Sequence, residues 1–234
     1  MSDRATHPRR FSAPGDAVVA REPVVEISRY RGFTRVNHWI TALCLILLVI
    51  SGLALFHPSL YFLSGLFGGG QTTRWIHPFI GIVLVVSFLV LFLQLFRLNL
   101  LRREDLAWVR NIGDVATGHD ERLPEFGKYN LGQKFVFWAM FWLILVLIVS
   151  GVMIWYQMFP TLVDIPTRRV ALLVHSIAAV LIILVFILHV YAAFWVRGTI
   201  RAMTAGTVTG GWAWRHHRKW LREVAGRQRT GPAE

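Results

Sequence analysis

The sequence has a single cysteine and few charged residues. Cys44 is the only cysteine among 234 residues, and Asp, Glu, Lys and Arg together make up 16% of the chain. One cysteine excludes a disulfide framework, a thiolate metal cluster and a haem attached through a Cys-x-x-Cys-His motif. With so little charge and with 55% apolar residues, the chain is too hydrophobic for an ordinary soluble domain.

Long stretches of the chain contain no Asp, Glu, Lys or Arg. They lie at 36–73, 75–96, 135–163 and 170–196. About 20 apolar residues in a helix cross the roughly 30 Å of hydrocarbon in a bilayer. The first stretch holds one span and a loop, because Pro58 and three consecutive glycines interrupt it. We therefore predict an all-α membrane protein, a bundle of four transmembrane helices that span about 36–56, 73–96, 133–155 and 167–195.

Basic residues gather in three of the segments that flank the predicted spans. Of the 25 Lys and Arg residues, 22 lie before the first span, in the loop 97–134 or in the segment from 197 onward. The positive-inside rule places these segments, and with them both termini, on the cytoplasmic side of a bacterial inner membrane. Nucleic-acid binding is the rival explanation of the positive charge, but the chain has no recognition motif. We expect contact with membrane lipid and none with nucleic acid.

Two segments lie outside the predicted membrane domain at 29–203. Residues 1–28 are polar and contain three prolines but no apolar core, which predicts a disordered tail rather than a signal peptide. Residues 204–234 form a basic cytoplasmic segment. In it His216 and His217 stand among Arg and Lys, which predicts a surface patch that contacts lipid head groups or a partner.

Four of the nine histidines lie within or at the edge of the predicted spans. They are His38, His77, His175 and His189. Ionisable side chains are costly in a bilayer and are usually tied to function. A hydrogen bond that bridges two helices is the alternative explanation for any one of them taken alone.

The depths of these histidines sort them into two pairs. Fourteen residues separate His175 from His189, which is a rise of about 21 Å and about 40° short of four full turns. The two therefore share one face of the fourth span at two depths. In the predicted topology, His38 lies at the inner level with His189, and His77 lies at the outer level with His175. Two histidines at one depth can bind one haem iron from both sides.

These pairs predict two bis-histidine b haems that carry electrons. With both axial positions filled, neither iron can bind oxygen or a substrate. A zinc site would need ligands that converge on one point, and a proton relay would need carboxylates, which the spans lack. The first and third spans also share a Ser-Gly pair, at 51–52 and 150–151. Such a pair allows close helix packing, and the alternative is that it makes room for a flat cofactor.

Three motifs extend this interpretation to a known family. They are WIHPFIG at 75–81, GKYNLGQK at 127–134 and HVYAAFWVRG at 189–198. Over about residues 31–224 the chain resembles the gamma subunit of bacterial respiratory formate dehydrogenases, a cytochrome b membrane anchor. The resemblance implies the same two histidine pairs as ligands of an inner and an outer haem.

The resemblance also implies partners and an electron acceptor. In such complexes a periplasmic molybdenum or tungsten subunit oxidises formate, and an iron–sulfur subunit with its own membrane helix passes electrons to the outer haem. The inner haem delivers them to menaquinone or ubiquinone near the cytoplasmic face, and the complex can form a higher oligomer. The matching quinone motif is Asn130, Gly132 and Gln133, close to His189. From the residues alone, these amides either contact a quinone carbonyl or cap the third span.

Two other functions stay open at this point. The first is a dihaem cytochrome b anchor of a hydrogenase or of another molybdoenzyme, because no residue of this chain acts on formate. The second is a haem-free membrane transporter or scaffold, in which the histidines only pack helices together.

Overall fold

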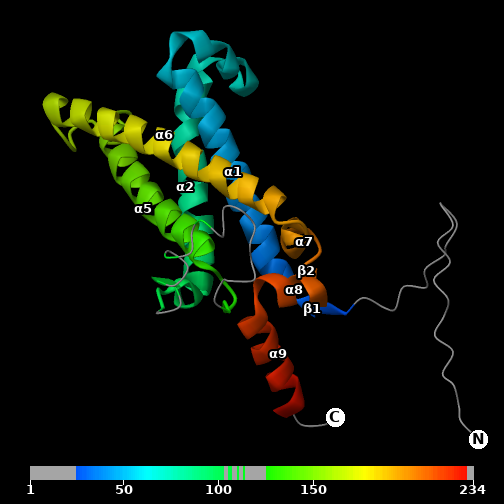
Figure 1. Cartoon of the computed structure of the whole chain (residues 1–234). Helices are drawn as coiled ribbons and strands as arrows, with labels where there is room; N and C mark the ends of the chain where they lie inside the picture. The colour runs from blue at the N-terminus through cyan, green and yellow to red at the C-terminus, as the bar shows by residue number, and fades with distance from the viewer. Residues whose placement is uncertain (1–24, 103–104, 107–109, 111–112, 114–124, 231–234) are drawn as a thin grey trace, which may run out of the picture.

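A computed structural model describes residues 25–102, 105, 106, 110, 113 and 125–230 of the chain. Most of the predicted N-terminal tail therefore lies outside the described residues, but its last residues differ from the prediction, because Glu26–Ser28 form a strand. Four long helices dominate the fold (Figure 1): α1 Gly32–Phe56, α2 Gly70–Leu95, α5 Leu131–Ile154 and α6 Ile165–Trp195. All four are long and apolar enough to cross a membrane. The predicted four-helix membrane bundle is confirmed, and each helix begins two to four residues earlier than predicted.

Shorter elements connect and extend the long helices. They are β1 Glu26–Ser28, the 3-10 helices η1 Pro58–Phe67 and η2 Phe96–Asn99, α7 Thr199–Thr204, β2 Thr207–Thr209, α8 Gly210–His216 and α9 Arg218–Thr230. In Figure 1, η1 lies at one end of the bundle in cyan, whereas α7 to α9 lie at the opposite end in orange and red.

The long helices end where the sequence provides local stop signals. Pro58 disfavours helical backbone at His57, where α1 ends. Gly68 and Gly69 have φ of 82° and 100°, a backbone that favours glycine, and they turn the chain from η1 into α2. At the start of α6, the Asp164 carboxylate accepts a hydrogen bond of 3.1 Å from the Thr167 backbone N–H.

The four long helices form two hairpins, α1–α2 and α5–α6 (Figure 1). One buried cluster draws side chains from all four helices: Cys44, Leu45, Leu84, Ile144 and Ile182. Between α2 and α5, the rings of Phe92 and Phe141 stack with their centroids 4.4 Å apart. Large apolar side chains such as Val86 and Leu173, 61% and 62% exposed, face outward, as expected for helices that contact lipid.

A buried polar network joins α1 to α2 inside the first hairpin. The Asn37 amide donates to the Ser87 carbonyl at 2.9 Å, and the Ser87 hydroxyl donates to Asn37 Oδ1 at 2.8 Å. The Thr41 and Ser87 hydroxyl oxygens lie 2.6 Å apart. Because unpaired polar groups are costly in a bilayer, this network sets how α1 and α2 face each other.

The segments that precede α1 and follow α6 fold together into a small unit that we term the terminal platform. Its antiparallel strands β1 and β2 pair Ile27 with Val208. Its core also includes Ala202, Trp212, Ala213 and Trp220. Arg29 lies 4.9 Å from the ring centroids of both Trp212 and Trp220, and it donates to the Lys128 carbonyl at 2.6 Å. The platform therefore connects the segment before α1 and the segment after α6 to the loop that precedes α5.

His217 belongs to the core of this platform, so our prediction of a surface patch at that residue is wrong. It is only 1% exposed, and its Nδ1 donates to the Gly127 carbonyl at 2.8 Å. Burial, helped by the charge of Arg29, lowers the pKa of His217 to about 3. The run of Arg and Lys around it suggested exposure, but the fold buries the imidazole beside the guanidinium.

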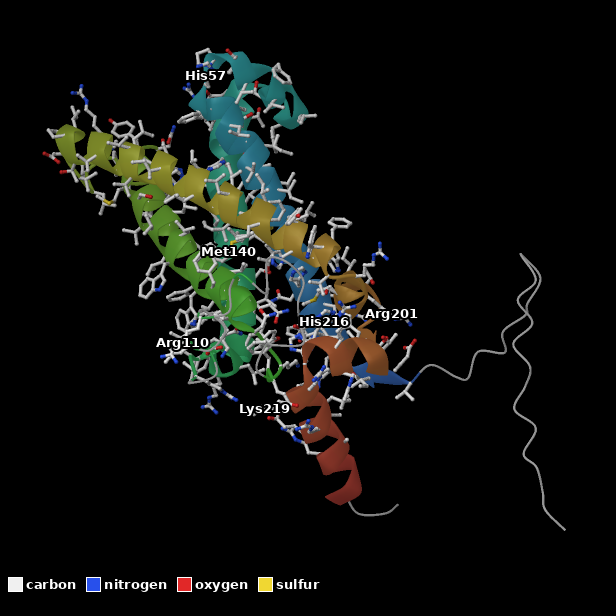
Figure 2. The ribbon with its side chains drawn as sticks, viewed as in Figure 1. His57, Arg110, Met140, Arg201, His216 and Lys219 are labelled. Atoms are coloured by element: carbon white, nitrogen blue, oxygen red, sulfur yellow. The ribbon has the colours of Figure 1, made fainter. Side chains whose placement is uncertain are left out.

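Basic side chains lie at the end of the bundle that carries the terminal platform. Figure 2 labels Arg110, Arg201 and Lys219 at the end that carries the terminal platform, and His57 at the opposite end. At the platform end a buried ion pair joins Lys134 to Asp105 at 2.7 Å, with side chains 4% and 6% exposed. The pair neutralises the cation at the start of α5.

Candidate functional site

The first pair of membrane histidines, His77 and His175, lies between the two hairpins. We keep the names outer pair, for His77 with His175, and inner pair, for His38 with His189, from the predicted topology. His77 is in the first third of α2, and His175 is in the first third of α6. Their ring centroids are 6.4 Å apart, with an interplanar angle of 65°. Each helix starts at the η1 end of the bundle, so both histidines lie toward that end.

The inner pair, His38 and His189, has nearly the same geometry. His38 lies in the second turn of α1 and His189 near the end of α6. Their centroids are 6.3 Å apart, with an interplanar angle of 52°. A single helix, α6, thus supplies one histidine to each pair, and the helical rise sets the two pairs about 21 Å apart along it.

The spacing within each pair suits a metal ion held between two rings. Two imidazoles that bind one ion from opposite sides, at about 2.0 Å each, place their ring centroids about 6.3 Å apart. Both observed separations match this value. The residues present therefore fit a haem iron with two axial histidines at each level.

The repeated Ser-Gly pairs contact the outer histidines. The Ser51 hydroxyl oxygen lies 2.7 Å from His77 Nδ1, and the Ser150 hydroxyl oxygen lies 3.0 Å from His175 Nδ1. A Cβ atom added to Gly52 would lie 3.5 Å from Cε1 of His77. The equivalent atom on Gly151 would lie 3.4 Å from Cε1 of His175. Each serine therefore bonds one outer imidazole, and each glycine leaves space for that same ring.

The polar start of α5 forms a helix cap. The Asn130 side-chain oxygen accepts a hydrogen bond of 3.0 Å from the Gln133 backbone, and Gln133 Oε1 accepts one of 3.1 Å from the Asn130 backbone. This reciprocal arrangement is a capping box. Asn130, Gly132 and Gln133 are all partly exposed. The cap uses both amide oxygens and leaves both side-chain NH2 groups as donors.

Comparison with known proteins decides the family. The family model described as prokaryotic cytochrome b561 matches residues 29–206. This chain belongs to that family. The cytochrome b561 family is a helical haem-binding bundle, which agrees with the four membrane helices and the paired histidines.

Curated relatives of this cytochrome b are subunits of formate dehydrogenases. The cytochrome b556(fdo) subunit of Escherichia coli K12 is 46% identical over 198 residues, which cover 85% of this chain and 93% of the relative. The nitrate-inducible cytochrome b556(Fdn) subunit of the same strain is 37% identical, over 85% of this chain and 91% of the relative. The Haemophilus influenzae subunit is 36% identical, over 84% and 83%. The resemblance found in the motifs is confirmed.

Several residues around the site were not predicted as part of it. Sequence reasoning recognised the Ser-Gly repeat but did not connect Ser51 or Ser150 to a histidine. The signal was present, because each Ser-Gly pair stands in the helix that precedes an outer histidine in its hairpin. The buried Lys134–Asp105 pair was also missed, because its partners are 29 residues apart and no local pattern joins them.

Proposed function

We propose that this cytochrome b is the membrane anchor and electron-transfer subunit of a formate dehydrogenase complex. In this proposal it passes electrons from a periplasm-side iron–sulfur subunit, through two bis-histidine b haems, to a quinone near the cytoplasmic face. The observation that carries the proposal is the pair of histidine couples at 6.3 and 6.4 Å, at two levels of one bundle. The identity to formate dehydrogenase cytochrome b subunits supports the choice of complex.

The four histidines would hold the haem irons as axial ligands, His38 with His189 and His77 with His175. Haems bound in this way supply one-electron transfer. The helices contribute rigid positions for the rings, because each imidazole comes from the interior of a long helix rather than from a loop. With two protein ligands for each iron, such a site would favour electron transfer over binding of small molecules.

Single substitutions test this assignment. His175→Ala should remove one haem and leave the inner one, and His189→Ala should remove the other and leave the outer one. Haem content and the reduced-minus-oxidised spectrum of the purified protein measure both. His57→Ala is a matched control, because His57 caps η1 outside the four spans. Loss of both haems or of neither in the two ligand variants would contradict the pairing.

Asn130, Gly132 and Gln133 are the proposed quinone contacts, with His189 at the same level. The available amide NH2 groups at the start of α5 support this role, because they can donate to a quinone carbonyl. Asn130→Asp retains a capping oxygen but removes the donor. We expect this variant to keep both haems while reoxidation of the reduced protein by a menaquinone or ubiquinone analogue slows. Unchanged reoxidation would remove Asn130 from the site.

The partners and the orientation form the last part of the proposal. We infer an iron–sulfur subunit with a membrane helix and a molybdenum or tungsten catalytic subunit, with both termini of this chain in the cytoplasm. In native membranes, formate should reduce the haems and hydrogen should not, which separates this complex from a hydrogenase. A reporter fused after α9 should be active only on the cytoplasmic side. Haem reduction by hydrogen, or a periplasmic reporter, would contradict these assignments.

A further inference from the structure

The outer and inner histidine pairs differ in their hydrogen bonds. Each outer imidazole has a serine hydroxyl within 3.0 Å of its Nδ1 atom, Ser51 for His77 and Ser150 for His175. In contrast, the Nδ1 atom of His38 in the inner pair is buried with no partner in the part of the chain that the structure describes. No comparison assigns a role to these serines, and the role inferred for them rests on the proposed haem ligation.

The direction of the serine hydrogen bonds is set by the backbone around them. Ser51 Oγ lies 2.7 Å from the Leu47 carbonyl and 3.3 Å from the Leu48 carbonyl. A carbonyl only accepts, and a hydroxyl has one hydrogen, so that hydrogen is directed at the Leu47 and Leu48 carbonyls. The Ser51 oxygen must therefore accept a hydrogen bond from His77 Nδ1–H.

The second hairpin repeats this arrangement. Ser150 Oγ lies 2.6 Å from the Val146 carbonyl and 3.3 Å from the Leu147 carbonyl, so it accepts from His175 Nδ1–H in the same way. The Leu147 carbonyl is a second acceptor for the His175 ring, and His77 has no such backbone partner among the described residues. Both outer histidines thus carry their proton on Nδ1, which leaves the Nε2 lone pair free for a metal. Two independent helix pairs therefore select the same tautomer.

We propose that Ser51 and Ser150 are positioning residues that hold the outer haem at a lower reduction potential than the inner haem. An imidazole that donates its second N–H to an acceptor becomes a more basic ligand. A more basic ligand stabilises the more positively charged, oxidised iron. Because only the outer pair has these hydroxyl acceptors among the described residues, the reduction potential is lowered at the outer haem alone. Such an order of potentials favours electron movement from the outer to the inner level.

The test is a redox titration of the purified haem-loaded protein and of serine variants. The midpoint potential that remains in His175→Ala, which lacks the outer haem, identifies the inner one. In Ser51→Ala and Ser150→Ala we expect the outer haem to be reduced more readily, with its reduction equilibrium constant raised about threefold to tenfold, or about 30–60 mV. The double variant should shift further, and the inner potential should stay unchanged.

Two controls distinguish the loss of the hydroxyl acceptor from a change in side-chain packing. Ser51→Thr and Ser150→Thr retain a hydroxyl and should restore the wild-type outer potential. Ser176→Ala removes a serine next to His175 that makes the same backbone contact, to the Leu172 carbonyl at 2.9 Å, but lies on a different face of α6. That variant should titrate like wild type. If an alanine variant loses the outer haem, retention in the matching threonine variant supports the role of the hydroxyl.

The inference fails if both haems are present in the double alanine variant and the outer potential is unchanged. It also fails if both haems shift equally, or if the outer haem is lost from the alanine and threonine variants alike. None of these results would change the assignment of the four histidines as haem ligands in the wild-type protein. A wild-type protein without haem, in contrast, would overturn the proposed function itself.

Discussion

Gly151 offers a graded test of how closely the bundle surrounds the outer pair. It lies on α5 opposite His175, and a Cβ atom at this position would lie 3.4 Å from Cε1 of that ring and 3.8 Å from Nδ1. Carbon atoms make favourable contact at about 3.5–4.0 Å. Gly151→Ala should therefore fit, with a movement of the ring by a few tenths of an ångström at most.

Gly151→Val exceeds the space that this geometry provides. A γ carbon extends about 1.5 Å beyond Cβ, so one directed at the ring would come within about 2 Å of it and push it away by more than about 1 Å. Metal–ligand distances tolerate only about 0.2 Å. We expect the alanine variant to bind two haems per chain, and the valine variant to bind only the inner one.

The assay is the haem-to-protein ratio of the purified variants, with the reduced-minus-oxidised spectrum as a second measure. Gly65→Val is the matched control, because no heavy atom lies within 4 Å of a Cβ built there and Gly65 is in η1. It should bind two haems. Two haems in Gly151→Val, or the loss of one in the Gly65 control, would refute the reasoning that Gly151 makes room for His175.

Three further predictions concern stability. Lys134→Met leaves the buried Asp105 carboxylate without its cation and should cost about 3–5 kcal/mol, seen as a lower unfolding temperature in detergent; the double variant with Asp105→Leu should recover most of this loss. Asn37→Ala removes the two hydrogen bonds between the Asn37 side chain and Ser87, leaves the Thr41 hydroxyl and the Asn37 carbonyl beside the Ser87 hydroxyl, and should cost about 1–3 kcal/mol in the same assay, with Ser176→Ala unchanged. His217 has its pKa lowered from 6.5 to about 3, so the unfolded chain binds a proton that the fold excludes. Its stabilising contribution is complete above about pH 6.5 and falls by about 2 kcal/mol at about pH 5, and His217→Asn should flatten this pH dependence.

The sequence predicts the membrane helices well, because the bilayer imposes a length and a lack of charge that can be read locally. The same holds for the levels of His175 and His189, since they share one helix and its rise is constant. The starts of the helices were less predictable. Asn130 and Asp164 provide caps one residue before α5 and α6, so each helix begins within the polar sequence that precedes its apolar span.

Contacts between helices were not predictable in the same way. Ser51 meets His77 only because α1 and α2 are rotated so that these two faces meet, and the Ser-Gly repeat did not reveal that rotation. In the terminal platform, the burial of His217 could not be predicted from the sequence for the same reason. Its burial depends on Gly127 and Arg29, which lie 90 and 188 residues away in the chain. Because these partners are so distant in sequence, the neighbouring Arg and Lys residues predicted an exposed His217, and the contacts that bury it could not be read from the sequence.

The most direct test of the account is the haem content of the purified protein, measured with and without carbon monoxide. Two protein ligands on each iron predict two low-spin b haems per chain, with a reduced spectrum that carbon monoxide does not change. Absence of haem, a single haem per chain, or a reduced spectrum that shifts on addition of carbon monoxide would contradict the two bis-histidine sites.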